Sequence, residues 1–169
     1  RNMENLITYY LEMLDAPVFE PRTSTMPAYC LIECTGIQPE FNRFLYTLVG
    51  KQWDWTDRLA WDTSQWHALV SSPDLRTWVA YSDGIIAGYF ELRRERGDVE
   101  ILYFGLSPEF IGQGFGRPLL EDAITKAWSW EGVSRVWVHT CNLDHPVALK
   151  NYERRGFRLY KTEQEPLNL

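Results

Sequence analysis

A glycine-rich loop constrains the fold more than any other part of the sequence. The loop contains Gly112, Gly114 and Gly116, and it lies between an apolar segment, residues 99–106, and an amphipathic segment, residues 114–130. The first segment predicts a strand that is covered on both faces, and the second predicts a helix. Such a junction brings unpaired backbone N–H groups to the positive end of a helix dipole. It predicts a site for a phosphate or pyrophosphate group, although a plain strand-to-helix turn would use the same glycines.

The spacing of the glycines excludes two common nucleotide-binding motifs. Arg117 stands where the dinucleotide fingerprint GxGxxG requires glycine. The Gly-Lys-Ser/Thr sequence of the P-loop is absent. Pro118 lacks an N–H group and is tolerated only in the first turn of a helix, so we expect the free donors at residues 112–117. A phosphate site of a different kind remains.

The rest of the chain predicts one mixed α/β domain, of the α+β type, with helices on both faces of its sheet. Periodicity favours helices over residues 3–14, 39–49, 63–70, 114–130 and 146–155, and strands over 29–35, 77–82, 85–92, 99–106, 135–140 and from 157 onward. Asp83-Gly84 indicates a hairpin turn, and Asp144 or His145 is expected to cap the last helix. We place an N-terminal helical or extended segment at 1–27 and the domain at 28–169.

Composition excludes several classes of protein. The net charge of −6 argues against a nucleic-acid partner, and no apolar run approaches the roughly 18 residues of a membrane span. Cys30, Cys34 and Cys141 are odd in number and form no CxxC pair, so we expect no disulfide framework and no metal site. Unpaired thiols suit a reducing cytoplasm. An aromatic content of 15% is compatible with a homodimer.

Two motifs together resemble the GNAT superfamily of acetyl-CoA-dependent N-acetyltransferases. Gly114 and Gly116 match the glycines of the family's Arg/Gln-x-x-Gly-x-Gly/Ala loop, with Ile111 in place of the first Arg or Gln. The second motif is Ala148-x-x-x-Tyr152-x-x-x-Gly156-Phe157, which matches the helix and turn at the thiol end of the coenzyme. The run from residue 139 to 157 is similar to uncharacterised bacterial members. The resemblance covers about residues 28–169 in element order.

The resemblance implies a fold and a cosubstrate. The sheet would be mixed and mostly antiparallel, and it would splay between the fourth and fifth strands of the family, where acetyl-CoA enters. The family holds the pyrophosphate on the loop backbone and the pantetheine arm at the end of the fourth strand. In this sequence those positions are Phe104, Gly105, Leu106, Gly112, Gln113, Gly114, Phe115, Gly116 and Arg117. We expect Gly105 to lie at a β-bulge that frees backbone groups for the ligand.

Two side chains are candidates for proton transfer. The resemblance implies that Tyr152 is the general acid for the departing thiolate; the alternative is an aromatic ring that packs on the sheet. Glu100 is the only carboxylate within the apolar run and has the spacing of the general-base glutamate of histone-type members. It would otherwise lie at an exposed strand start. Glu91 is the reserve candidate, and His139 and His145 are given no catalytic role.

The connection between the first two helices of the domain is the candidate acceptor site. It contains Trp53, Asp54 and Trp55, and aromatic faces beside carboxylates attract cationic amines. Tryptophans that merely fill the open end of the sheet are the alternative. The resemblance predicts transfer of an acetyl group to a primary amine of a small molecule or peptide, by direct attack in a ternary complex. A non-catalytic acyl-CoA-binding module or an interaction domain on the same fold remains open.

Overall fold

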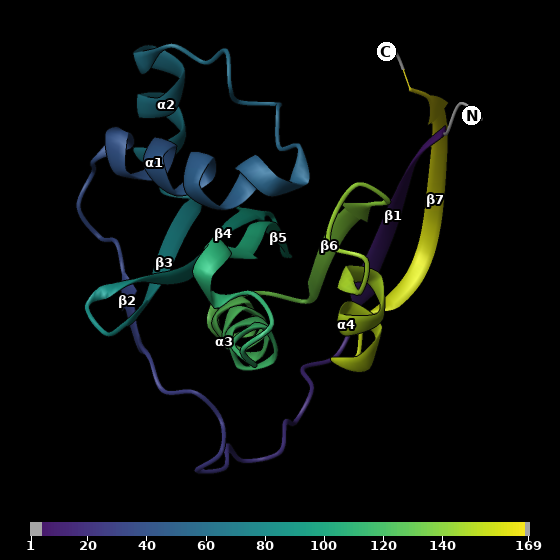
Figure 1. The fold of residues 1–169 in the computed structure, drawn as a ribbon. Coiled ribbons are helices and arrows are strands. Elements are labelled where there is room, and N and C mark those ends of the chain that lie inside the picture. Colours follow the sequence, from purple (N-terminus) through teal and green to yellow (C-terminus); the bar gives the residue numbers. More distant parts are fainter. Residues whose placement is uncertain (1–4, 168–169) are drawn as a thin grey trace.

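The computed structural model describes residues 5–167 and contains one seven-stranded sheet in the order β2-β3-β4-β5-β6-β1-β7 (Figure 1). The strands are β1 Asn5–Met13, β2 Cys30–Glu33, β3 Leu75–Ser82, β4 Ile85–Glu95, β5 Asp98–Leu106, β6 Arg135–Cys141 and β7 Arg158–Pro166. The helices are α1 Pro39–Gly50, α2 Thr63–Val70, α3 Gly116–Ser129 and α4 Ala148–Arg154, with short 3₁₀ turns at Lys51–Trp53 and Pro108–Phe110.

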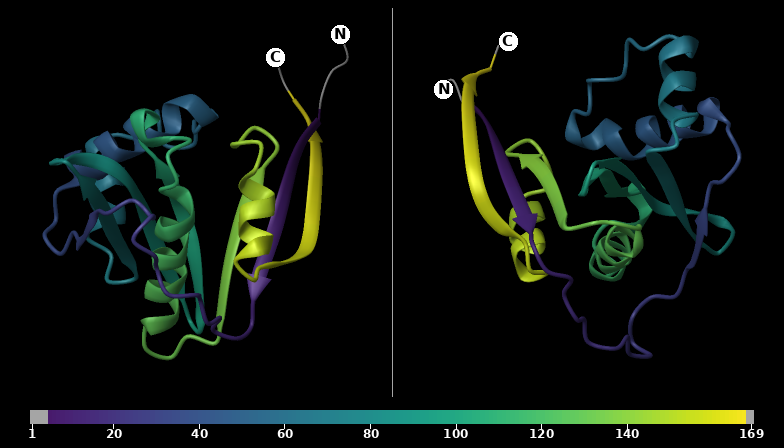
Figure 2. Two further views of the ribbon diagram at one scale, coloured as in Figure 1. Left: turned by 60° about the horizontal axis from the view of Figure 1, so that its bottom comes forward. Right: turned by 180° about the vertical axis from the view of Figure 1, so that it is seen from behind.

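Helices cover the two faces of the sheet unequally. The pair α1 and α2 lies on one face over β3, β4 and β5, whereas α3 and α4 lie on the opposite face (Figures 1 and 2). The larger hydrophobic cluster lies on the α3 side and includes Leu119 and Ile124 of that helix. A smaller cluster beneath α1 joins Leu45 and Val49 to Tyr89. The helices over both faces confirm the predicted mixed α/β class.

The strands β3, β4 and β5 form an antiparallel meander, as the sequence predicts. The first turn consists of Asp83 and Gly84, whose φ angles are 54° and 78°. Two successive positive φ angles are the geometry of a type I′ hairpin turn, which Asp-Gly adopts readily. The second turn, Arg96-Gly97, likewise begins with a positive φ of 59° at Arg96.

The sheet divides between β5 and β6. These strands run parallel and pair only where Asp98–Ile101 lies opposite Arg135–Val138. Beyond this segment the two halves of the sheet diverge (left view of Figure 2). Counted from β2, β5 and β6 are the fourth and fifth strands, so the predicted splay is confirmed.

The predicted helix over residues 3–14 is wrong over the part that the structure describes. Residues Asn5–Met13 form β1, which pairs antiparallel with both β6 and β7. Residues 3 and 4 lie outside the described residues. At the end of the strand the burial alternates: Leu11 and Met13 are buried in the core, while Tyr10 and Glu12 lie on the other face. The N-terminal segment therefore contributes an interior strand to the same sheet, and the boundary at residue 27 stays a prediction.

The far edge of the sheet is formed by β7. It extends from Arg158 to Pro166, longer than the opening that the sequence indicates, and all nine of its residues are exposed. The ends of β1 and β7 lie side by side, at Asn5 and Pro166. Within residues 5–167 no helix combines the length and the apolar character needed to cross a membrane.

Candidate active site

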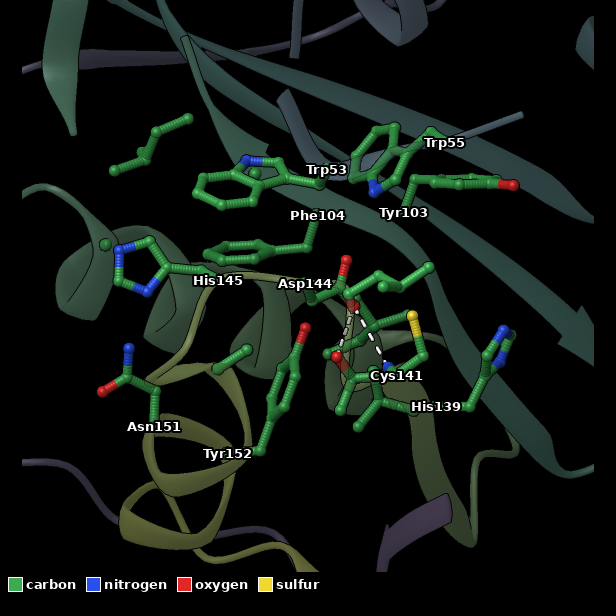
Figure 3. Close-up of a pocket in the computed structure, with 18 of the residues that line it drawn as sticks. Trp53, Trp55, Tyr103, Phe104, His139, Cys141, Asp144, His145, Asn151 and Tyr152 are labelled. Carbon is green, nitrogen blue, oxygen red and sulfur yellow. Dashed lines mark hydrogen bonds between the residues drawn. The ribbon is translucent and has the colours of Figure 1, made fainter. Parts of the chain in front are cut away.

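A cavity of about 540 Å³ occupies the gap where β5 and β6 diverge (Figure 3). One wall is the second half of β5, from Ile101 to Leu106, together with the glycine loop. The opposite wall is the end of β6, from Val138 to Cys141, and the first residues of α4. The connection between α1 and α2 closes a third side with Trp53 and Trp55. The cavity therefore runs between the two faces of the sheet, through the gap that the missing β5–β6 hydrogen bonds leave open.

The bulge that the sequence assigns to Gly105 lies elsewhere in β5. The register with β4 shifts between the pairs Glu91–Tyr103 and Leu92–Ile101, so the extra residue is Leu102. Gly105 has a different requirement, because a Cβ atom there would lie 2.5 Å from a methyl carbon of Val49 in α1. Glycine thus lets α1 pack closely against β5 beside the cavity.

The glycine loop has the backbone conformation that only glycine adopts easily. Gly112 and Gly114 have φ angles of 81° and 87°. The helix α3 begins at Gly116, so the N–H groups of its first turn have no partner inside the helix. Gly112, Gly116 and Arg117 line the cavity, and Ile111 lines it at the position where the family motif has Arg or Gln. The loop therefore presents a helix N-terminus to the cavity.

The middle of the loop turns away from the cavity. The side chain of Gln113 donates a hydrogen bond from Nε2 to the Glu109 carbonyl at 2.5 Å. The ring of Phe115 is buried against Phe110, at 5.0 Å between centroids. Gly114 faces Pro27 of the connector from β1 to β2. Gln113, Gly114 and Phe115 thus shape the loop, and they are absent from the cavity lining.

Tyr152 projects from α4 into the cavity. Its side chain is 8% exposed, and its ring makes an edge contact with Phe157, at 5.7 Å between centroids. Figure 3 shows its hydroxyl directed toward the part of the cavity that contains Asp144. Burial and the negative charge of Asp144 raise the pKa of Tyr152 well above its ordinary value. The phenol therefore keeps its proton at neutral pH, as a proton donor must.

Glu100 is buried in the sheet and does not line the cavity. It is 3% exposed, which contradicts an exposed position at the strand start. Its carboxylate accepts a hydrogen bond from Arg93 at 2.9 Å, and its other oxygen lies 3.1 Å from Nδ1 of His139. The hydrogen bond to Glu100 and its charge raise the pKa of His139. Glu100 thus contacts the cavity only through His139.

Glu91, the reserve candidate, belongs to a buried ion pair. It is fully buried, and one of its carboxylate oxygens lies 2.9 Å from a guanidinium nitrogen of Arg58. Asn42 donates a further hydrogen bond to the other oxygen at 3.3 Å. The guanidinium lies over the rings of Tyr103 and Trp61, at 4.4 and 5.0 Å. This pair links the α1–α2 connection to β4, and neither of its two residues lines the cavity.

The predicted acceptor residues Trp53, Asp54 and Trp55 all line the cavity. Asp54 has a φ of 57°, the left-handed conformation that asparagine and aspartate tolerate best among side-chain-bearing residues. Trp55 packs against Tyr103, at 4.7 Å between ring centroids. Trp53 reaches across the opening to His145, at 5.2 Å. The two tryptophans therefore line the cavity and also pack against neighbouring rings.

Several lining residues were missed from the sequence. They are Leu6 and Thr8 from β1, His139, Thr140 and Cys141 from β6, Asp144 from the turn between β6 and α4, and Asn151 from α4. The local signal for the two β1 residues was the run of β-branched and aromatic side chains at residues 7–10. No motif marked Asp144. It does not cap α4, since Val147 occupies that position without a side-chain cap.

The charged lining of the cavity is acidic on the side of the α1–α2 connection. Within the described residues three carboxylates line the cavity: Asp54, Asp57 and Asp144. Arg117 is the cationic lining residue, at the glycine loop, where it also pairs with Glu121 at 3.2 Å. Residues 5–167 contain no group of three or more His, Cys, Asp or Glu side chains suited to a metal ion.

Solved structures share this fold. A GNAT-family acetyltransferase structure from Novosphingobium aromaticivorans aligns with a TM-score of 0.61 at 16% identity, over 98% of this chain and 65% of that one. An IAA acetyltransferase from Bacillus cereus aligns with a TM-score of 0.60 at 24% identity, over 79% of each chain. An aminoglycoside acetyltransferase from an uncultured soil metagenomic sample gives 0.61 at 16% identity, over 76% of this chain and 87% of that one.

Two of the solved structures are considerably longer than this chain, which spans 61% and 65% of their lengths. The comparison with curated proteins finds no significant match. The family model described as Acetyltransferase (GNAT) family matches residues 37–157, which is more than half of the chain and includes the glycine loop and Tyr152. The chain belongs to the GNAT acetyltransferase family.

Proposed function

We propose that the protein transfers the acetyl group of acetyl-CoA to a primary amine. The observation that carries the proposal is the cavity between β5 and β6, which has a helix N-terminus at one end and a buried, protonated phenol inside. A negatively charged pyrophosphate suits the N-terminus of α3, because unpaired N–H groups and the helix dipole favour anions there. The residues present therefore fit the coenzyme.

Different parts of the cavity would bind different parts of the coenzyme. Gly112, Gly116 and Arg117 would hold the pyrophosphate through backbone N–H groups and one cationic side chain. The end of β5, from Phe104 to Leu106, is not paired with β6 and would offer backbone groups to the pantetheine arm. Gln113, Gly114 and Phe115 would act indirectly, by holding the loop in its conformation.

Tyr152 is the proposed general acid of the reaction. Acetyl transfer forms an amide bond and breaks the carbon–sulfur bond of the thioester, and the departing sulfur needs a proton near neutral pH. The phenol is held by α4 and by Phe157, and it carries its proton at neutral pH. We place the acceptor amine beside Trp53, Asp54 and Trp55 at the acidic side of the cavity.

A screen of amines with acetyl-CoA and a thiol reagent tests the proposal. The panel contains aminoglycosides, polyamines, aromatic ethylamines and short peptides, and an acceptor is recognised by the release of free thiol. Thermal unfolding with acetyl-CoA at about 100 times its Kd is expected to show about 2.7 kcal/mol of stabilisation. Stabilisation without thiol release for any amine would support a non-catalytic acyl-CoA-binding module instead. The absence of stabilisation by acetyl-CoA, CoA and longer acyl-CoAs would reject coenzyme binding altogether.

A further inference from the structure

The reaction needs a proton acceptor, and the two carboxylates that the sequence indicates for this role, Glu100 and Glu91, are both bound to other side chains. Glu100 is engaged with Arg93 and His139, and Glu91 is engaged with Arg58. Neither carboxylate lines the cavity. An ammonium group has to lose a proton before its nitrogen can attack a thioester, so the reaction needs a base within the cavity to accept that proton.

Asp144 is the lining carboxylate with a fixed orientation. It lies in the turn between β6 and α4, where one of its oxygens, Oδ2, accepts hydrogen bonds from the Thr140 hydroxyl and from the Cys141 N–H at 3.3 Å. Its other oxygen, Oδ1, has no hydrogen-bond partner in the described part of the chain. Two hydrogen bonds on one oxygen hold the carboxylate in place and leave the other oxygen available to a ligand.

Asp144 lies between the proposed acceptor side of the cavity and the proposed general acid, Tyr152. Figure 3 shows it between the Trp55–Tyr103 side of the cavity and the hydroxyl of Tyr152, which points toward it. The charge of Asp144 is the electrostatic contribution that, together with burial, raises the pKa of Tyr152. Asp144 therefore lies between the acidic acceptor side and the group that would protonate the leaving sulfur.

The other two lining carboxylates occupy different environments. Asp57 is exposed, and its carboxylate lies 3.5 Å from the hydroxyl of Tyr103. Asp54 is also exposed, and it lines the cavity from the left-handed turn that follows Trp53. Both belong to the α1–α2 connection, whereas Asp144 lies on the same side of the cavity as Tyr152. Asp54 and Asp57 suit the attraction of a cation, and Asp144 suits proton transfer beside the reacting bond.

We propose that Asp144 is the proton acceptor of the transfer and that it returns the proton to Tyr152. This inference rests on the proposed transfer to an amine. Asp144 first takes one proton from the acceptor ammonium and releases it to solvent. The neutral nitrogen then forms the bond to the thioester carbon, the carbon–sulfur bond breaks, and the Tyr152 hydroxyl gives its proton to the sulfur. Asp144 takes the second nitrogen proton and passes it to the Tyr152 oxygen, so that one proton is released per turnover.

Asp144→Asn tests the assignment with an alkylamine acceptor from the screen. Asparagine keeps the size of the side chain and an oxygen for the local hydrogen bonds, but it does not accept a proton. We expect kcat to fall by about 10²–10⁴-fold with an unchanged thermal shift by acetyl-CoA. Asp74→Asn is the matched control, since it makes the same change at an aspartate that pairs with Arg94 and does not line the cavity. This control is expected to keep kcat and KM within about threefold of the wild type.

A second variant separates proton transfer from local structure. Asp144→Ser keeps an oxygen for the Cys141 N–H and leaves room for a small carboxylate, so formate is expected to restore kcat at least tenfold while chloride does not. If Asp144→Asn retains kcat, or if formate fails to rescue a folded Asp144→Ser protein, Asp144 is not the proton acceptor. Both of these results leave the amine transfer of the wild type intact. A wild-type protein that acetylates no amine overturns the proposed function, and this inference with it.

Discussion

Replacement of Glu91 by glutamine is expected to destabilise the fold strongly without touching the cavity. Glutamine preserves the volume of the side chain but leaves the guanidinium of Arg58, which is 5% exposed, without its counter-charge. Loss of one partner from a buried ion pair typically costs about 3–5 kcal/mol. For a domain of this length that corresponds to a fall in Tm of about 6–20 °C. Urea unfolding of Glu91→Gln measures the loss directly.

Glu33→Gln is the matched control for this prediction. Glu33 forms two hydrogen bonds with Arg76, at 2.8 and 2.9 Å, but both side chains are partly exposed. Water screens such a pair, so its loss is expected to cost about 0–1 kcal/mol. The double variant Arg58→Met/Glu91→Met is expected to recover most of the lost stability, because no buried charge remains. A loss of less than about 1 kcal/mol in the free energy of unfolding of Glu91→Gln would refute the reasoning, since it would mean that water or other groups stabilise the charge of Arg58.

Three further predictions concern the site. Tyr152→Phe keeps the ring contact with Phe157, so acetyl-CoA binding should persist while kcat falls by about 10²–10⁴-fold; an unchanged kcat with a good acceptor would make the tyrosine a packing residue. Gly114→Val places a β-branched side chain at a φ of 87°, so the folded variant should lose the rise in Tm that acetyl-CoA causes. A normal rise in Tm would mean that the loop is a structural turn that does not bind the coenzyme. Glu100 raises the pKa of His139, so their attraction is complete below about pH 6.5 and is lost as the pH rises through that raised pKa. Glu100→Gln should therefore lose more stability at about pH 5.5 than at about pH 9 in urea unfolding, and equal losses would contradict the pairing.

Local sequence patterns predicted the elements that have a regular apolar spacing or a characteristic turn. The α3 helix and the β3–β4 hairpin follow from a helical stripe and from Asp83-Gly84, and both are confirmed. The same reasoning failed for β1, because short apolar segments fit both periods. Pairing with β6 on one side and β7 on the other selects the strand. Pairing over such a distance in the sequence is not encoded in any local window.

The cavity was predicted in outline and not in its details. The glycine loop, Tyr152 and Trp53–Trp55 were found because motifs or unusual composition mark them. Burial is a tertiary property, so the sequence did not reveal that Glu100 is engaged with Arg93 and His139. Gly105 was assigned to a bulge, whereas the close approach of α1 requires the glycine and Leu102 is the bulged residue. In each case the deciding contact comes from another element.

The position of β1 has a consequence for how the chain folds. The hydrogen bond from the Ile7 N–H to the Asn142 side chain joins residues 135 positions apart. During synthesis β1 leaves the ribosome long before β6 and β7 exist, so it waits without partners while the β2–β5 half assembles from contacts that are mostly local. Contacts between distant segments slow folding, because the intervening chain must be ordered before they form. We therefore expect the β6-β1-β7 half, and with it one wall of the cavity, to form last, and a ribosome-bound chain that ends before residue 135 to expose β1 to proteases and chaperones.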